Sequence, residues 1–100
     1  MSILARFTPT KLTTEMYREV NRRLEEAGLW PHPDGLEVHV CFGGDPTLLV
    51  SEIWSSQEQM EAFAQRLMPV LSEVGVEFTH QPEILPVENV VANRTRATAS

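Results

Sequence analysis

The sequence predicts an α+β domain in which two helices cover one face of a four-stranded antiparallel sheet. Two segments carry apolar residues at every third or fourth position, which indicates helices, and four short apolar segments bounded by proline or glycine indicate strands. Their order along the chain is strand, helix, strand, strand, helix, strand. One hundred residues suffice for one such domain, which we expect to span residues 1–92, with 93–100 as a disordered tail.

The first strand is expected at residues 3–7, and a helix follows over residues 12–27. Thr13 or Thr14 can cap the start of this helix, and Gly28 is expected to end it. Its apolar face consists of Leu12, Met16, Val20, Leu24 and Ala27.

Two strands are expected next, at residues 36–42 and 48–54, joined by a five-residue hairpin loop. A capping box then starts the second helix, formed either by Ser56 with Gln59 or by Ser55 with Glu58. The apolar face of this helix consists of Met60, Phe63, Ala64, Leu67, Leu71 and Val74.

The end of the second helix contains Pro69, which predicts a kink or a break near Met68. Gly75 is expected to terminate the helix. Residues 76–80 are either a short strand or a linker, and residues 83–91 are expected to form an irregular strand at the sheet edge, where proline is tolerated.

This order of elements is the ferredoxin-like β-α-β-β-α-β arrangement. Its helices cover one sheet face only, while the strands carry apolar residues on both faces. The face without helices would then be an apolar patch, which normally marks an interface. The sequence therefore predicts a homodimer that pairs through its sheets.

Strand register decides which side chains share a face. If Phe42 lies opposite Leu48, then His39 lies opposite Ser51 with Cys41 diagonal to it. Trp54 would lie on the other face of the sheet.

Composition excludes several classes of protein. The net charge of −6 argues against binding to nucleic acid and against a polybasic membrane contact. No apolar run is long enough to cross a membrane, and the first ten residues lack the apolar segment of a signal peptide, so we expect a cytoplasmic protein. Cys41 is the single cysteine, and the histidines lack metal-ligand spacing, so neither an intrachain disulfide nor a metal site is expected.

Three residues are candidates for catalysis: His39, Trp54 and Tyr17. His39 is either a general base or a structural histidine bonded to Ser51. Trp54 either forms one wall of an aromatic pocket or packs in the core. Tyr17 either points its hydroxyl into a cleft between helix and sheet or lies on the surface.

Five residues are candidates for contact with a substrate: Cys41, Ser51, Met60, Phe63 and Leu67. Cys41 would be a nucleophile if His39 activated it, but a free cysteine is more often a small buried apolar residue.

Three features of the sequence together resemble a known family. They are the element order, a last strand that ends in Val90-Val91, and the segment from Glu52 to Phe63, in which Trp54 ends a strand just before a serine-capped helix. The chain resembles the dimeric α/β-barrel superfamily, in particular its antibiotic-biosynthesis monooxygenase-like branch, many of whose members are uncharacterised. The resemblance implies a homodimeric barrel with a cleft between sheet and helices in each subunit.

Members of the superfamily include cofactor-independent monooxygenases of aromatic polyketides, haem-degrading enzymes, isomerases, decarboxylases and ligand-sensing domains. The haem-degrading members use an asparagine on the first strand and a histidine about ten residues beyond the tryptophan. Here the first strand has no asparagine and that later position is Ala64, which disfavours haem degradation. Of the asparagine, tryptophan and tyrosine used by the polyketide oxygenases, only Trp54 can be placed.

We therefore expect an oxidoreductase of the cofactor-independent monooxygenase type, acting on a small apolar or aromatic carbonyl compound. In this hypothesis His39 removes an acidic proton and the substrate carbanion reduces O₂ without a flavin or a metal. The alternatives are an isomerase or cyclase that uses the same base, a non-catalytic dimeric protein that binds a small ligand, and a purely structural dimer.

Overall fold

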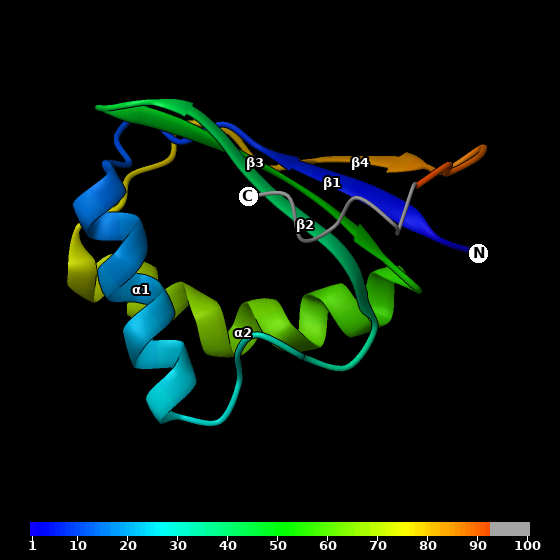
Figure 1. Ribbon diagram of the computed structural model, residues 1–100, viewed down its shortest axis with the longest axis horizontal. Helices are drawn as coiled ribbons and strands as arrows, with labels where there is room; N and C mark the ends of the chain where they lie inside the picture. Colours follow the sequence, from blue (N-terminus) through cyan, green and yellow to red (C-terminus); the bar gives the residue numbers. More distant parts are fainter. Residues whose placement is uncertain (93–100) are drawn as a thin grey trace.

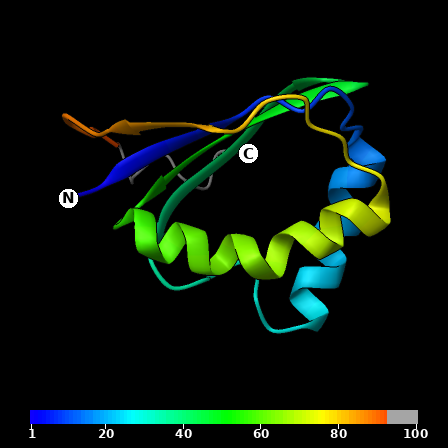
Figure 2. The ribbon, with the colours of Figure 1, turned by 180° about the vertical axis from the view of Figure 1, so that it is seen from behind.

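The computed structural model describes residues 1–92 and has the predicted order of elements. The six elements are β1 (Ile3–Phe7), α1 (Thr14–Glu26), β2 (Leu36–Gly44), β3 (Thr47–Trp54), α2 (Gln57–Val74) and β4 (Glu83–Pro86). The four strands form one antiparallel sheet in the order β2-β3-β1-β4. Both helices lie on the same side of this sheet (Figures 1 and 2). The α+β ferredoxin-like fold is thereby confirmed, and the tail expected at 93–100 lies outside the described residues.

The predicted caps are confirmed for both helices, but α1 begins at Thr14 and ends at Glu26, which is shorter at both ends than the predicted range 12–27. Thr13 caps α1, because its hydroxyl accepts a hydrogen bond of 3.1 Å from the backbone N–H of Met16. Ser56 caps α2 in the same way through the N–H of Gln59, at 3.2 Å. Gly28 and Gly75 follow the two helices with positive φ angles of 74° and 99°, which only glycine adopts at little cost.

Of the kink or break predicted near Met68, the break is wrong, because α2 runs from Gln57 to Val74 as one helix with Pro69 inside it, and the kink stays a prediction. A proline removes one backbone hydrogen bond and crowds the preceding turn, at a cost of about 3 kcal/mol. Apolar packing continues on both sides of it: Phe63 is buried before the proline, and Leu71 and Val74 pack against the core after it. We infer that this packing offsets the cost and keeps the helix continuous.

The predicted register of the hairpin is wrong by one residue. Phe42 pairs with Leu49 rather than Leu48, because the strands extend further than expected and leave only Asp45 and Pro46 as the loop. The slip changes every cross-strand partner. His39 therefore lies opposite Glu52, not Ser51.

The slip also changes which side chains of β2 and β3 lie on the same face of the sheet. Val38, Val40 and Phe42 lie on the face without helices and are 36–46% exposed. The side chain of His39 lies on the helix-covered face together with those of Glu52 and the fully buried Trp54. A register shift between Leu36 and Val38 returns Leu36 to the covered face, where it packs against the core.

The last strand is shorter than expected and ends at Pro86 rather than at residue 91. It pairs only with β1, whose first residue Ile3 lies opposite Pro86, so the chain beyond has no strand to pair with. The edge position expected for this proline-containing segment is confirmed. The segment at 76–80 is a linker that forms one isolated bridge, between Glu77 and Lys11.

Candidate functional site

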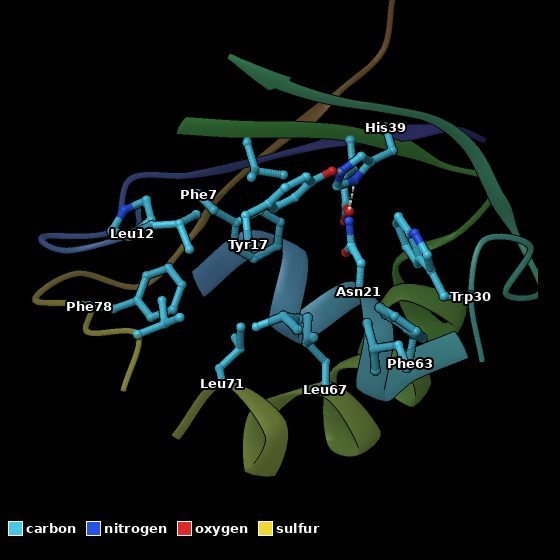
Figure 3. Close-up of a pocket in the computed structure, with 16 residues that line it drawn as sticks. Phe7, Leu12, Tyr17, Asn21, Trp30, His39, Phe63, Leu67, Leu71 and Phe78 are labelled. Carbon is cyan, nitrogen blue, oxygen red and sulfur yellow. Dashed lines mark hydrogen bonds and ion pairs between the residues drawn. The ribbon is translucent and has the colours of Figure 1, made fainter. Parts of the chain in front are cut away.

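Three polar side chains form a hydrogen-bonded chain on the helix-covered face of the sheet. The Tyr17 hydroxyl lies 2.7 Å from Nε2 of His39, and Nδ1 of His39 lies 2.6 Å from Oε2 of Glu52. Trp54 extends the chain, because its indole N–H donates to Oε1 of Glu52 at 3.0 Å. Figure 3 shows Tyr17 and His39 directed toward each other above the apolar side chains of α2.

The fold explains why these residues meet. His39 and Glu52 are cross-strand partners in β2 and β3, so their side chains leave the sheet side by side. Tyr17 lies in the first turns of α1, and the start of that helix is tied to the β2–β3 hairpin: the hydroxyl of Thr14 donates to Oδ1 of Asp45 at 2.9 Å. The hairpin thus positions both ends of the Tyr17–His39 bond.

Glu52 is the one buried charged residue in the part of the chain that the structure describes, at 5% exposure. A buried carboxylate is costly unless hydrogen bonds satisfy it. Here each carboxylate oxygen accepts one bond, from His39 or from Trp54. An ionised carboxylate can only accept, so Nδ1 of His39 is the donor to Glu52. In the neutral form of the ring, Nε2 then accepts from the Tyr17 hydroxyl.

The Tyr17 hydroxyl is held in its protonated form. Burial raises the pKa of Tyr17 above its ordinary value of 10.0, and the side chain of Asn21 acts in the opposite direction. At neutral pH this group therefore donates a hydrogen bond instead of bearing a charge.

Two hollows adjoin the chain of hydrogen bonds. The inner cavity, about 70 Å³ in volume, lies between α1, the sheet and α2, and the outer cavity, about 670 Å³, lies between α2, the sheet and the segment at 78–82. The polar side chains that line the inner cavity are Tyr17, Asn21, His39 and Glu52. The two cavities share Phe7, Glu52, Phe63, Leu67, Leu71 and Phe78 as lining residues.

The two cavities differ in volume and can therefore hold ligands of different size. A water molecule occupies about 30 Å³ in the liquid, so the inner cavity has room for only a few atoms. The outer cavity lies within the range of roughly 300–1,000 Å³ that is typical of small-molecule sites.

The structure brings most of the predicted site residues to these cavities. Tyr17 and His39 line the inner cavity, and Trp54 and Met60 line the outer one. Phe63 and Leu67 line both. Trp54 is fully buried, so it contacts Glu52 and packs in the core at the same time.

Ser51 and Cys41 are placed differently. Ser51 pairs with Val40 and Arg6 on the face without helices, so the prediction that it shares the site of His39 is wrong, a consequence of the one-residue slip. Cys41 is half-buried near Tyr17 and lines neither cavity. Burial raises the pKa of its thiol, with Tyr17 acting in the opposite direction, which disfavours a nucleophilic thiolate.

Sequence reasoning missed Glu52, Trp30 and Asn21. Glu52 carried a signal, because it is the one charged residue in a mostly apolar strand and such residues are rarely buried without partners. Trp30 lies in a loop without periodicity, yet its ring centroid is 4.8 Å from that of His39, edge to face. Asn21 lies one helical turn beyond Tyr17 and lines the same cavity.

The described residues, 1–92, contain no group of three or more histidine, cysteine, aspartate and glutamate side chains that could hold a metal ion. None of their helices is both long enough and apolar enough to cross a bilayer.

No family model matches this chain, and no curated protein does. Solved structures do match. The structural-genomics protein YJCS superposes with a TM-score of 0.63 at 14% identity over 88% of this chain and all of the other. SnoaB, a cofactor-independent oxygenase from Streptomyces nogalater, gives a TM-score of 0.59 at 12% identity over 92% of this chain and 96% of its own.

A protein from Deinococcus radiodurans that is classed as an antibiotic biosynthesis monooxygenase gives a TM-score of 0.50 at 17% identity, over 93% of this chain and 96% of its own. The chain shares the ferredoxin-like fold of antibiotic-biosynthesis-monooxygenase-like proteins. At these identities the likeness concerns the fold and not the chemistry.

Proposed function

We propose that this protein is a small-molecule enzyme that removes a proton from an apolar or aromatic carbonyl compound, in the manner of a cofactor-independent monooxygenase. The observation that carries the proposal is the hydrogen-bonded chain Tyr17–His39–Glu52 at the wall of an apolar cavity. Titratable groups linked in this way inside a cleft are typical of proton-transfer sites.

Each residue of this hydrogen-bonded chain has a separate role in the proposed proton transfer. Glu52 accepts a hydrogen bond from the protonated Nδ1 of His39, which leaves the lone pair of Nε2 directed at the Tyr17 hydroxyl. As a substrate proton passes to the Tyr17 oxygen, the hydroxyl proton passes to Nε2. Glu52 then stabilises the imidazolium that forms. Tyr17 is thus the group that contacts substrate, and His39 is the base behind it.

The oxidation can be balanced with O₂ as the only oxidant. The substrate CH₂ group loses one proton to the relay, and the resulting carbanion adds O₂ to give a peroxide anion. The relay returns its proton to this anion, and the hydroperoxide loses water, so that R₂CH₂ and O₂ yield R₂C=O and H₂O. The carbanion itself supplies the electrons, so the proposal includes no flavin or metal.

The test is oxygen consumption with a panel of apolar carbonyl and phenolic compounds in the presence of a chelator. General acid–base groups contribute roughly 10²–10⁴-fold to rate, so we expect His39→Ala and Tyr17→Phe each to lower kcat by at least about 10²-fold. His32→Ala is the matched control, because His32 is an exposed loop residue that lines neither cavity. The assignment of these catalytic roles is refuted if His39→Ala and Tyr17→Phe each leave turnover unchanged. It is refuted equally if the single variants His39→Ala and Trp54→Phe each leave turnover unchanged.

A non-catalytic ligand-binding protein is the second candidate. One observation favours it: both ring nitrogens of His39 already have protein partners, so the imidazole does not itself face a ligand. This alternative predicts saturable binding of compounds from the same panel with no product formed.

The proposal includes a homodimer that pairs through the face of the sheet without helices. Val40, Phe42 and Leu85 are 44–46% exposed on that face, and Val38 lies beside them. Apolar side chains gathered on an open sheet usually mark an interface, and a second copy of the same face would cover them. Both cavities lie on the opposite face, so pairing leaves them accessible.

A further inference from the structure

Among residues 1–92, Glu52 is the one charged side chain that lines both the inner and the outer cavity. We propose that it determines ligand specificity: the cleft takes apolar ligands whose head group donates a hydrogen bond, such as an alcohol, a phenol or an amine, and rejects carboxylates. This inference deepens the proposed function, because it assumes that the same cleft binds the substrate.

The charges around the two cavities are unfavourable for an anion. Within residues 1–92, the side chains lining them that are charged or can become so by gaining a proton are Glu52, Glu61, His39 and His80, and neither lysine nor arginine is among the lining residues. His39 is already engaged with Glu52, and His80 is exposed at the rim. A ligand carboxylate beside Glu52 would be a second buried negative charge without a cationic partner, which is costly.

Glu52 retains capacity to accept a further hydrogen bond. A carboxylate has about four acceptor positions, and the protein fills two of them, through His39 and Trp54. A ligand hydroxyl or ammonium group placed where the two cavities meet would fill a third. The acceptor is charged, so such a bond is stronger than one between neutral groups.

The rest of the wall suits an apolar, preferably aromatic, ligand body. Phe7, Phe63 and Phe78 line both cavities, and Met60 and Met68 line the outer one. Aromatic rings also attract an ammonium group through their faces. The outer cavity has the volume for a ring system, whereas the inner cavity accommodates only the head group.

Three naphthalene probes that differ in the head group test the proposal by isothermal titration calorimetry at neutral pH: 2-naphthol, 2-naphthylmethylamine and 2-naphthoate. We expect the alcohol and the amine to bind, and the carboxylate to bind at least about tenfold more weakly, a difference of about 1.4 kcal/mol. Glu52→Gln keeps the size of the side chain and removes its charge, so it should bring the three dissociation constants to within about threefold of one another.

Glu25→Gln is the matched control, because it removes the same charge from an exposed position of α1 that lines neither cavity, and it should preserve the wild-type ratio. The proposal is overturned if the wild type binds naphthoate as tightly as naphthol, if it binds none of the probes, or if Glu52→Gln folds and retains the discrimination. The wild-type comparison stands even if that variant does not fold. Selective binding without turnover of any compound would instead refute the proposed enzymatic activity and leave the specificity intact.

Discussion

Replacing Glu52 by alanine should destabilise the protein far more than an ordinary substitution of a charged residue. The change removes the acceptor of two hydrogen bonds, one from Trp54 and one from His39. Trp54 is fully buried, so its indole N–H would be left without a partner or water, at a cost of about 1–3 kcal/mol. The His39 side chain is 17% exposed, so losing its bond costs about 1 kcal/mol.

Together these losses predict a decrease of roughly 2–4 kcal/mol in the free energy of unfolding. For a chain of this length each kcal/mol lowers Tm by about 4–8 °C, so the variant should melt at least about 8 °C below the wild type. The assay is urea denaturation followed by tryptophan fluorescence and circular dichroism, at one fixed protein concentration because dimerisation would contribute.

Glu25→Ala provides the control for this experiment, since a substitution at an exposed helical position should change stability by no more than about 0.5 kcal/mol. A decrease below about 1 kcal/mol for Glu52→Ala would contradict the buried hydrogen bonds assigned to Glu52.

Three further predictions concern single residues. The chain contains one tyrosine, so the ultraviolet absorbance of phenolate reports Tyr17 alone, and it should titrate above 10.0; titration at the ordinary value would contradict its burial. The unfolded chain releases this proton at a lower pH than the folded chain, so the contribution of Tyr17 to stability is complete below pH 10 and is lost as pH rises through the folded pKa. Burial raises the pKa of Cys41 above 9.0, so a thiol reagent at that pH should react more slowly with the folded protein than with the urea-unfolded chain, and equal rates would refute this. Phe42→Glu places a charge on the open sheet face and should give a particle of 11.3 kDa by light scattering where the wild type gives about twice that mass; a monomeric wild type would refute the dimer.

The order of elements could be predicted from the sequence because it depends on local signals. Periodic apolar residues, the caps at Thr13 and Ser56, and the glycines at 28 and 75 are each readable within a few positions. Helix continuity at Pro69 could not be predicted in this way, since it depends on packing between residues distant in the sequence.

The candidate site was predictable only in part, for a reason that lies in the hairpin. Its loop is two residues long, not five, and this difference alone exchanges Ser51 for Glu52 as the partner of His39. Periodicity places a residue on one face of a strand but does not specify the register between strands. Trp30 reaches His39 from a loop, where no periodic pattern applies.

The proposed proton relay depends most directly on the direction of the hydrogen bonds at His39. Nitrogen-15 NMR of the imidazole rings, with His39→Gln to assign the signal, measures which ring nitrogen carries the proton. We predict that His39 has its proton on Nδ1, bonded to Glu52, and that the Nε2 signal shifts in Tyr17→Phe because the hydroxyl no longer donates to it. A proton on Nε2 in the neutral ring, or an Nε2 signal unaffected by Tyr17→Phe, would contradict the proton relay.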